Sequence, residues 1–443
     1  MSGGPCWVSK LQFVSEVFCF CLSLLAPMYA HGQDTPLDDA ARSRIVSKIA
    51  DLLKANYVFP DMGERSAQHI QAQLAQGAYS KLTTLFDFSN RLTADLQSIN
   101  HDHHVIVFMP QGPLEEEVAT AAENELRAKE DARTNFGFEK LEHLPGNVGY
   151  LDLRSFADAD WAAPTAIGAM SFLASSDAVI IDVRNNHGGQ PNMIQLISSY
   201  FFDKFTHLGD MYWRKGDRTE QFWTQPYLPG KRMADVPLYI LTSSRTFSGP
   251  EGFAYDLKIL KRATIVGETT GGGANAGYSY PVVDGLAIFI TTGRAINPIT
   301  KTDWEGKGVE PDIKVSASDA FNDAYREALK VIAAQAEDPK QKTEAVWAVD
   351  TLDSHMKPLS LSQNEKNALV AVYGHSQITL KAGELYLELT DQPAFRLLPL
   401  VPDTFGLEGL DDTRLRFLRD NSGKVTKLVV MYSDGSGNEV VRK

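Results

Sequence analysis

The chain has 443 residues, of which 43% are hydrophobic and 22% charged, with no low-complexity tract and no obvious internal repeat. This length is too great for one ordinary hydrophobic core and predicts two or three domains. The formal net charge is −13, and no stripe of lysines and arginines stands out. Nucleic-acid binding and binding to an anionic membrane surface are therefore poor explanations of this sequence.

Residues 1–32 have the features of a secretory signal peptide. Lys10 precedes an apolar run, Val17 to Ala26, that is too short to span a membrane. Small residues follow at Ala30 and Gly32. We expect an exported protein, periplasmic or extracellular, whose mature chain has no stable membrane span. An uncleaved membrane anchor is the alternative.

All three cysteines, Cys6, Cys19 and Cys21, lie inside this N-terminal segment. A cleaved chain would contain none of them. Disulfides, cysteine nucleophiles and thiolate metal ligands are then excluded from the folded protein.

Residues 37–112 are predicted to form an N-terminal helical domain, because apolar residues recur there at helical spacing in three successive runs. The third run ends in the polar sequence 100–104, and a short apolar strand follows at 105–108. The region therefore reads as a small helical bundle that delivers a histidine-rich turn.

Residues 113–335 are predicted to form an α/β core, which begins with a polar, helix-prone connector at 113–135. The segments 178–183 and 237–242 are nearly continuous apolar strands, as expected for strands buried on both faces. Each is followed by a turn and a helix. This alternation predicts a layered α/β structure.

The remaining chain is predicted to form a polar linker and a small C-terminal antiparallel β domain. The linker covers residues 336–357 and the domain residues 358–443, where short strands alternate with turns such as 421–423 and 433–435.

Ser248 is a candidate nucleophile because it lies between a buried strand and a helix that Pro250 opens. Backbone N–H groups at a helix start point toward any oxyanion formed beside them. Gly249 leaves room for a substrate to approach. The alternative is that Ser248 is a helix N-cap, a position that serine favours in any case.

Gly188 and Gly189 follow the apolar strand 178–183. Two glycines let the backbone turn its N–H groups outward, as a second oxyanion donor requires. An ordinary strand–helix turn is the alternative.

The turn from His101 to His104 contains candidate bases, since a serine hydroxyl needs a base and histidine is the usual one. Two alternatives stay open. One is a metal site made by His101, His103 and His104. The other is a polar helix end, where histidine complements the helix dipole.

Glu305 lies in a glycine-rich loop. Its carboxylate could orient the base or hold a substrate amine, although such a glutamate is often simply solvated. Next to a protonated histidine we expect Glu305 to stay ionised, because an opposite charge favours the charged form.

Four motifs follow one another along the chain, and their succession is far more specific than any one of them. They are Asp182-Val183-Arg184-Asn185-Asn186-x-Gly188-Gly189, Thr246-Phe247-Ser248-x-x-Glu251, Val266-Gly267-Glu268-Thr269-Thr270 and Gly308-Val309-x-Pro311-Asp312. In this order they resemble the tail-specific (C-terminal-processing) serine peptidases, and more closely their tricorn-core and interphotoreceptor-retinoid-binding-protein branch. The likeness covers about residues 37–320.

The resemblance implies a Clp-protease/crotonase-like ββα spiral core and a peptidase acting on peptides or proteins. It aligns Ser248 with the nucleophile, and the Gly249 N–H with one oxyanion donor. Gly188 and Gly189 resemble the other donor loop. No metal and no cofactor is implied, and a homo-oligomer is compatible with the sequence.

Within the resemblance, Asp102-x-His104 is similar to the D-x-H turn, with His104 in the place of the tricorn-type base. Glu305 resembles the glutamate that supports catalysis. One departure is plain. Tail-specific enzymes pair the serine with a lysine 25 residues later, and this position is Gly273. A Ser/Lys mechanism is therefore unavailable to this chain.

The same branch implies an alternative function. Its retinoid-binding members use the scaffold to hold apolar ligands without evident proteolysis. The chain would then be a non-catalytic binding module for apolar ligands.

Overall fold

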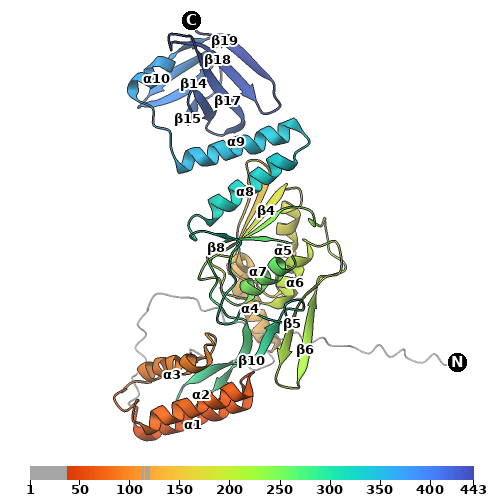
Figure 1. Ribbon diagram of the computed structural model, residues 1–443, viewed down its shortest axis with the longest axis vertical. Coiled ribbons are helices and arrows are strands. Elements are labelled where there is room, and N and C mark those ends of the chain that lie inside the picture. The colour runs from red at the N-terminus through yellow and green to blue at the C-terminus, as the bar shows by residue number, and fades with distance from the viewer. Residues whose placement is uncertain (1–36, 111–113, 115–119) are drawn as a thin grey trace, which may run out of the picture.

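The computed structural model describes residues 37–110, 114 and 120–443. The predicted signal segment and its cysteines lie outside the described residues. None of the helices in the described ranges is long and apolar enough to cross a membrane. Figure 1 shows an elongated molecule, with a helical region at one end, an α/β region in the middle and an all-β region at the other end.

Three helices form the N-terminal region, and side chains cap two of them. The Asp38 side chain accepts a hydrogen bond from the Ala41 N–H, and Thr84 accepts one from the Asp87 N–H. The buried faces of the helices pack together with Leu286, Ile288 and Ile290, which come from a distant part of the chain. The helices are α1 (Asp39–Asn56), α2 (Pro60–Ala75) and α3 (Leu85–Asn100).

The central region is built on a six-stranded sheet with the order β11-β8-β7-β4-β3-β2. All neighbouring strands are parallel except β2 and β3. β4 and β7 are buried along their whole length, which explains their continuous apolar sequences. The strands are β2 (Phe138–Leu144), β3 (Val148–Leu153), β4 (Ala178–Asp182), β7 (Leu238–Thr242), β8 (Thr264–Gly267) and β11 (Ile313–Lys314).

Helices cover both faces of this sheet, because alternate side chains of each strand point to opposite sides. Val179 and Ile181 of β4 pack against three helices on one face, whereas Ile180 packs against two helices on the other. The first three are α5 (Ala159–Leu173), α6 (Pro191–Ser199) and α7 (Gly249–Ile259), and the other two are α8 (Ala320–Gln335) and α9 (Pro339–Met356).

A second, antiparallel sheet joins the helical region to the core. Its strand β1 directly follows the helices and pairs with β10, so that Ile106 lies opposite Phe289. The chain 105–110 thereby folds back onto a strand that is far away in sequence. The strands are β1 (Ile106–Phe108), β5 (His207–Trp213), β6 (Arg218–Trp223), β9 (Asn275–Pro281) and β10 (Ala287–Ile296).

Two segments expected to be connectors are largely helical. The first contains α4 (Ala121–Arg133), which buries no residue. The second, expected as the linker 336–357, is almost entirely α9. Ala345, Ala348 and Leu352 of α9 are buried in one cluster with α8. This helix therefore belongs to the packed core, although its sequence is mostly polar.

The C-terminal region consists of the short helix α10 (Gln363–Leu369) and eight antiparallel strands in chain order. An antiparallel bridge joins Tyr373 of β12 to Arg442, just beyond β19, so the meander closes into a barrel around its own core. The predicted fold class is confirmed: an α/β core carries an N-terminal helical region and a C-terminal antiparallel β domain. The strands are β12 (Ala371–Tyr373), β13 (Ser376–Lys381), β14 (Glu384–Leu389), β15 (Phe395–Val401), β16 (Thr404–Leu407), β17 (Leu410–Arg419), β18 (Val425–Tyr432) and β19 (Gly437–Val441).

Candidate active site

The turns that carry Ser248 and the glycine pair lie side by side because the strands before them do. β4 and β7 are parallel neighbours, so their carboxyl ends meet at one edge of the sheet. Side chains fasten the two turns together. Thr246 Oγ1 donates to the Val183 carbonyl at 2.8 Å, and Ser243 Oγ donates to the Arg184 carbonyl at 2.5 Å.

Ser248 has an unusual backbone conformation, with φ 67° and ψ −120°. A non-glycine residue in such a region costs on the order of 1–3 kcal/mol and persists only where the surroundings fix it. The Ser248 N–H donates to Glu251 Oε2 at 2.7 Å, and the Ser248 carbonyl accepts from the Glu251 N–H at 2.9 Å. The turn between β7 and α7 is thus held in a strained form from both sides, as is common at functional sites.

Glu251 is the residue that fixes this turn. Its side chain is completely buried and accepts four hydrogen bonds, two on each oxygen. Oε1 accepts from Thr270 and the Gly272 N–H, and Oε2 from the N–H groups of Gly273 and Ser248. Burial raises the pKa of Glu251 to about 7, against the opposite effect of these hydrogen bonds. The sequence motif contained Glu251, but we assigned it no role; a glutamate three residues after the N-cap of α7 was the available signal.

The glycine pair supplies one exposed donor rather than two. The Gly188 N–H already donates to Asn186 Oδ1 at 3.0 Å. The bridge between Phe156 and Gly189 uses the Gly188 carbonyl and the Gln190 N–H, and so leaves the Gly189 N–H outside it. Gly189 has φ 139°, and a Cβ there would lie 2.2 Å from the Phe156 carbonyl oxygen, so only glycine fits.

Gly249 lies directly against this loop. A Cβ built on Gly249 would be 3.3 Å from the Gly189 backbone nitrogen. As the first residue of α7, Gly249 has an N–H that no carbonyl of the helix can accept. Two N–H groups, those of Gly189 and Gly249, therefore lie together next to Ser248. This is the arrangement that an oxyanion hole requires.

His104 reaches the same place from the helical region. His101 ends α3 in a left-handed conformation with φ 55°, and β1 then pairs with β10. The His104 ring packs on Phe247, the residue before Ser248, with ring centroids 4.6 Å apart. The His104 side chain is 10% exposed. Its burial lowers the imidazole pKa, although Asp102 acts in the opposite direction.

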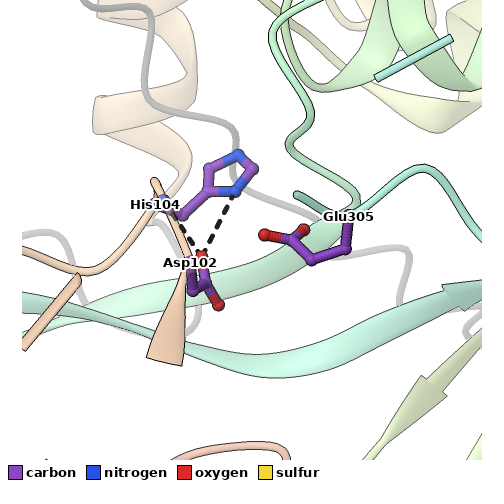
Figure 2. A group of neighbouring side chains, drawn as sticks. All are labelled: Asp102, His104 and Glu305. Carbon is purple, nitrogen blue, oxygen red and sulfur yellow. Dashed lines mark hydrogen bonds and ion pairs between the residues drawn. The ribbon is translucent and has the colours of Figure 1, made fainter. Parts of the chain in front are cut away.

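Asp102 anchors the turn that carries His104. Its buried carboxylate accepts the His104 backbone N–H at 3.0 Å and the hydroxyls of Tyr57 and Thr291 at 3.2 and 2.7 Å. The Asn275 amide donates to it as well, at 3.1 Å. Figure 2 shows the Asp102 carboxylate below the His104 ring, where Oδ1 is 3.9 Å from Nδ1.

The surroundings of Gly273 leave no room for a lysine side chain at this position. A Cβ at Gly273 would lie 2.6 Å from His104 Cε1 and 2.4 Å from Phe247 Cζ. The His104 and Phe247 rings together therefore fill the space into which a side chain at position 273 would extend. A lysine at 273 and this placement of His104 exclude one another.

Glu305 lies within this group, beside Asp102 and His104. Glu305 Oε2 accepts the N–H groups of Ala274 and Asn275 at 2.6 and 3.0 Å. Figure 2 shows the Glu305 carboxyl group directed toward His104 and Asp102. We expected it to be ionised beside a histidinium, which is not the resting state, because burial lowers the pKa of His104. In the resting site burial, and then the neighbouring Asp102, raise the pKa of Glu305 to about 9.

A metal site on His101, His103 and His104 is not formed, because His101 and His103 are exposed and do not converge with His104. In the described part of the chain, the ligand atoms that do lie within 4.8 Å of one another belong to Asp102, His104 and Glu305. Both Asp102 oxygens already accept hydrogen bonds. This makes the trio a poor cation site.

One pocket brings together four of the residues predicted from the sequence, whereas Gly188 and Glu305 do not line it. It is lined by Ser248, Gly249, Gly189, His104 and Gly273. Trp304, next to Glu305, also lines it and fixes its loop by donating to the Gly273 carbonyl at 2.8 Å. The structure thus brings together a serine, a buried histidine and two N–H donors at a single cavity.

Family models match the two halves of this arrangement. The model for peptidase family S41 matches residues 147–315, and the model for the N-terminal domain of peptidase S41 in eukaryotic IRBP matches residues 39–135. The chain belongs to peptidase family S41. The predicted tail-specific peptidase family is thereby confirmed.

Individual S41 relatives are distant and longer than the matched region. The carboxy-terminal processing protease CtpB of Bacillus subtilis is 28% identical over 212 residues, which are 46% of this chain and 42% of that protein. The chloroplastic carboxyl-terminal-processing peptidase 1 of Arabidopsis thaliana is 27% identical over 182 residues, 41% of this chain and 36% of that protein. The match therefore spans about two fifths of the length of these relatives.

Two solved structures are similar to this chain at low identity. The tricorn protease has a TM-score of 0.40 and 13% identity, with 64% of this chain and 35% of that chain covered. A lipoprotein from Streptococcus agalactiae has a TM-score of 0.42 and 14% identity, with 69% and 100% covered. The family assignment does not depend on these likenesses.

Proposed function

We propose that this chain is a serine peptidase in which Ser248 is the nucleophile and His104 the general base. The observation that carries the proposal is the position of the His104 ring. It packs on Phe247, lines the same pocket as Ser248 and occupies the space beside Gly273. The tail-specific peptidases that the sequence resembles have their lysine at this position. A histidine base in place of that lysine explains why position 273 is a glycine.

The reaction would begin with the attack of Ser248 Oγ on the peptide carbonyl carbon. The Ser248 proton passes to His104, which burial keeps neutral and therefore able to accept it. The carbonyl oxygen becomes an oxyanion that the N–H groups of Gly189 and Gly249 stabilise. The C–N bond then breaks, and His104 returns the proton to the leaving amine. Water releases the acyl group by the same steps.

Asp102 and Glu305 would have different tasks around the imidazole. Asp102 fixes the His104 turn, and its carboxylate lies 3.9 Å from Nδ1, where it can stabilise the imidazolium formed during attack. Glu305, neutral in the resting site, holds the Ala274 and Asn275 N–H groups and so positions the loop beside Gly273. Export, which residues 1–32 suggest, belongs to the same proposal.

A fluorophosphonate probe tests the assignment directly, because it reacts with an activated serine without any assumption about the substrate. We expect a single modified residue, Ser248, and no labelling of Ser248→Ala. Labelling of a different serine, or none together with tight binding of an apolar ligand such as a fatty acid, would favour the binding module instead.

A further inference from the structure

The pocket continues past Ser248 to a second group of polar residues. Asp256, on helix α7, lines this end, together with Asp210 of β5 and Asn297. Asp256 lies eight residues after Ser248. At 1.5 Å per residue it is displaced by about 12 Å along the helix. The described catalytic groups do not involve this end of the pocket.

The Asp256 carboxylate faces the strand β5 at a glycine. A Cβ on Gly209 would lie 3.2 Å from Asp256 Oδ2, so any other residue there would crowd this oxygen. The other oxygen, Oδ1, accepts a hydrogen bond from the Asn297 amide at 3.0 Å. The carboxylate is thus held in one orientation at the wall of the pocket.

The charged neighbour of Asp256 is another acid, so the two cannot form an ion pair. Burial is the main cause that raises the pKa of Asp256 to about 8, and the charged neighbour that adds to it is Asp210, another acid. Asp210 is itself occupied, since it accepts from His207 Nε2 at 2.6 Å. A half-buried carboxyl group with no positive partner in the described part of the chain gains most from a cation that enters with the ligand.

Apolar side chains line much of the pocket. They include Leu208, Met211, Phe222 and Ile296. Lysine and arginine side chains bury their methylene groups along such surfaces and keep the charged head at a polar end. The extended side chain of such a residue is roughly 6 Å long. With a contact of roughly 3 Å at each end, its reach matches the displacement of Asp256 from Ser248.

We propose that this end of the pocket is a cation subsite, in which Asp256 binds the ammonium or guanidinium group of the substrate residue whose carbonyl Ser248 attacks. The substrate class is then peptides with lysine or arginine at that position. This inference rests on the proposed peptidase function and adds a preference to it.

A purely structural role for Asp256 predicts something different. Asn297 Oδ1 accepts the Ile299 and Thr300 N–H groups, so Asp256 could simply tie α7 to this turn. An asparagine at position 256 retains an acceptor for the Asn297 amide. Asp256→Asn would then leave the selectivity for substrates unchanged, whatever it did to stability.

The test compares two peptide substrates that differ only in lysine or norleucine at the cleaved position, since norleucine has the lysine stem without the amine. For the unmodified protein we expect kcat/KM to favour lysine by at least tenfold, about 1.4 kcal/mol. In Asp256→Asn we expect this ratio to fall to about one, with norleucine cleavage retained. Glu310→Gln, an exposed acid outside the pocket, should keep the ratio of the unmodified protein. No lysine preference, or the same preference in Asp256→Asn, would overturn the subsite.

A binding measurement separates failure of the subsite from failure of the peptidase proposal. Ser248→Ala is titrated with the same two peptides carrying a fluorophore, and anisotropy is recorded. Lysine should bind more tightly than norleucine by about tenfold, and the added Asp256→Asn change should abolish the difference. If Ser248 resists fluorophosphonate but this difference is present, the peptidase proposal fails and the cation subsite stands. Equal binding of both peptides refutes the subsite even in an active enzyme.

Discussion

The nucleophile side and the base side of the pocket are built in opposite ways. Around Ser248 the buried polar groups are paired, and both Glu251 oxygens accept two hydrogen bonds each. On the base side, four buried atoms have no hydrogen-bond partner within the described residues. They are His104 Nδ1 and Nε2, Glu305 Oε1 and Asn275 Oδ1. Hydrogen bonds fix the turn on the nucleophile side, where the attacking atom must be held. On the base side, where a proton must move, these four polar atoms are unpaired.

The incomplete pairing is itself evidence for function. An unpaired buried polar atom costs about 1–3 kcal/mol, and native proteins contain few of them. The four atoms belong to the proposed base, His104, and to residues around it. If this view is correct, changes on the nucleophile side should act through geometry, and changes on the base side through protonation.

The largest effect should come from removing the nucleophile. Ser248→Ala should reduce kcat by about 10⁶, because no other group can form the acyl-enzyme. Peptide hydrolysis and thermal unfolding are measured together. We expect the unfolding temperature to change little, because alanine keeps the Cβ that strains this backbone conformation. Near-normal turnover would remove Ser248 from the mechanism.

Displacing the base without removing it is the next most severe change. Gly273→Ala would put a Cβ 2.6 Å from His104 Cε1 and 2.4 Å from Phe247 Cζ, so the two rings must shift from their places beside Ser248. We expect kcat to fall by about 10²–10⁴, the usual contribution of a general base. Gly168→Ala is the matched control, since a Cβ there meets nothing within 4 Å. Gly273→Lys in a His104→Ala background sharpens the test, because it should regain part of the activity that His104→Ala loses.

On the nucleophile side, Gly189→Ala should break the oxyanion donor. Its Cβ would collide with the Phe156 carbonyl at 2.2 Å, which forces the loop and its N–H group away. Loss of one such donor lowers kcat by about 10²–10³. KM should change little, because the donor acts on the transition state. A variant that raises only KM would mean that this loop binds the substrate and does not stabilise the oxyanion.

The sequence singled out Ser248 and the glycine pair because they lie within a few residues of buried parallel strands, where turn residues and helix starts are readable. Glu251 lies in the same turn, but we assigned it no role from the sequence. The sequence also placed His104, but through a resemblance and not through spacing. The partners of Asp102 could not be predicted. Tyr57, Asn275 and Thr291 are separated from it by 45, 173 and 189 residues.

Other misses have the same physical origin. β5, β6, β9 and β10 are antiparallel strands without strong alternation of polar and apolar residues, and they form only because distant segments pair. α9 has a polar sequence whose few apolar residues become informative once α8 lies against them. The resting charge of Glu305 could not be predicted either, because it depends on burial.

The pH dependence tests the base side specifically. His104 must be neutral to accept a proton, and its pKa lies below 6.5, mainly because the ring is buried. A lowered pKa keeps the neutral form populated at lower pH, so the acidic limb of kcat/KM should have its midpoint below 6.5. Below this midpoint the rate falls about tenfold per pH unit. An NMR titration of His104 in Ser248→Ala should give the same value; a midpoint above 6.5 would contradict it.

The smallest effect is expected at Glu305. Because its carboxyl group is neutral at pH 7, glutamine resembles the resting state closely. The glutamine side chain would keep an oxygen for the Ala274 and Asn275 N–H groups and place its amide NH₂ near Asp102. We expect kcat of Glu305→Gln within about threefold of the unmodified protein, and no change for the exposed control Glu310→Gln. Glu305→Ala should be worse, since two N–H groups lose their acceptor at about 1–3 kcal/mol each.

These Glu305 variants decide which carboxylate supports the imidazolium. If Glu305→Gln is nearly as active as the unmodified protein, the negative charge near His104 comes from Asp102, 3.9 Å from Nδ1. A fall of kcat by about 10² in Glu305→Gln, with KM unchanged, would instead mean that the ionised Glu305 acts in the transition state. Substrate binding would then have to lower its pKa, as a newly formed imidazolium next to it would do. The base side would still depend on protonation, but with Glu305 as the group that changes charge.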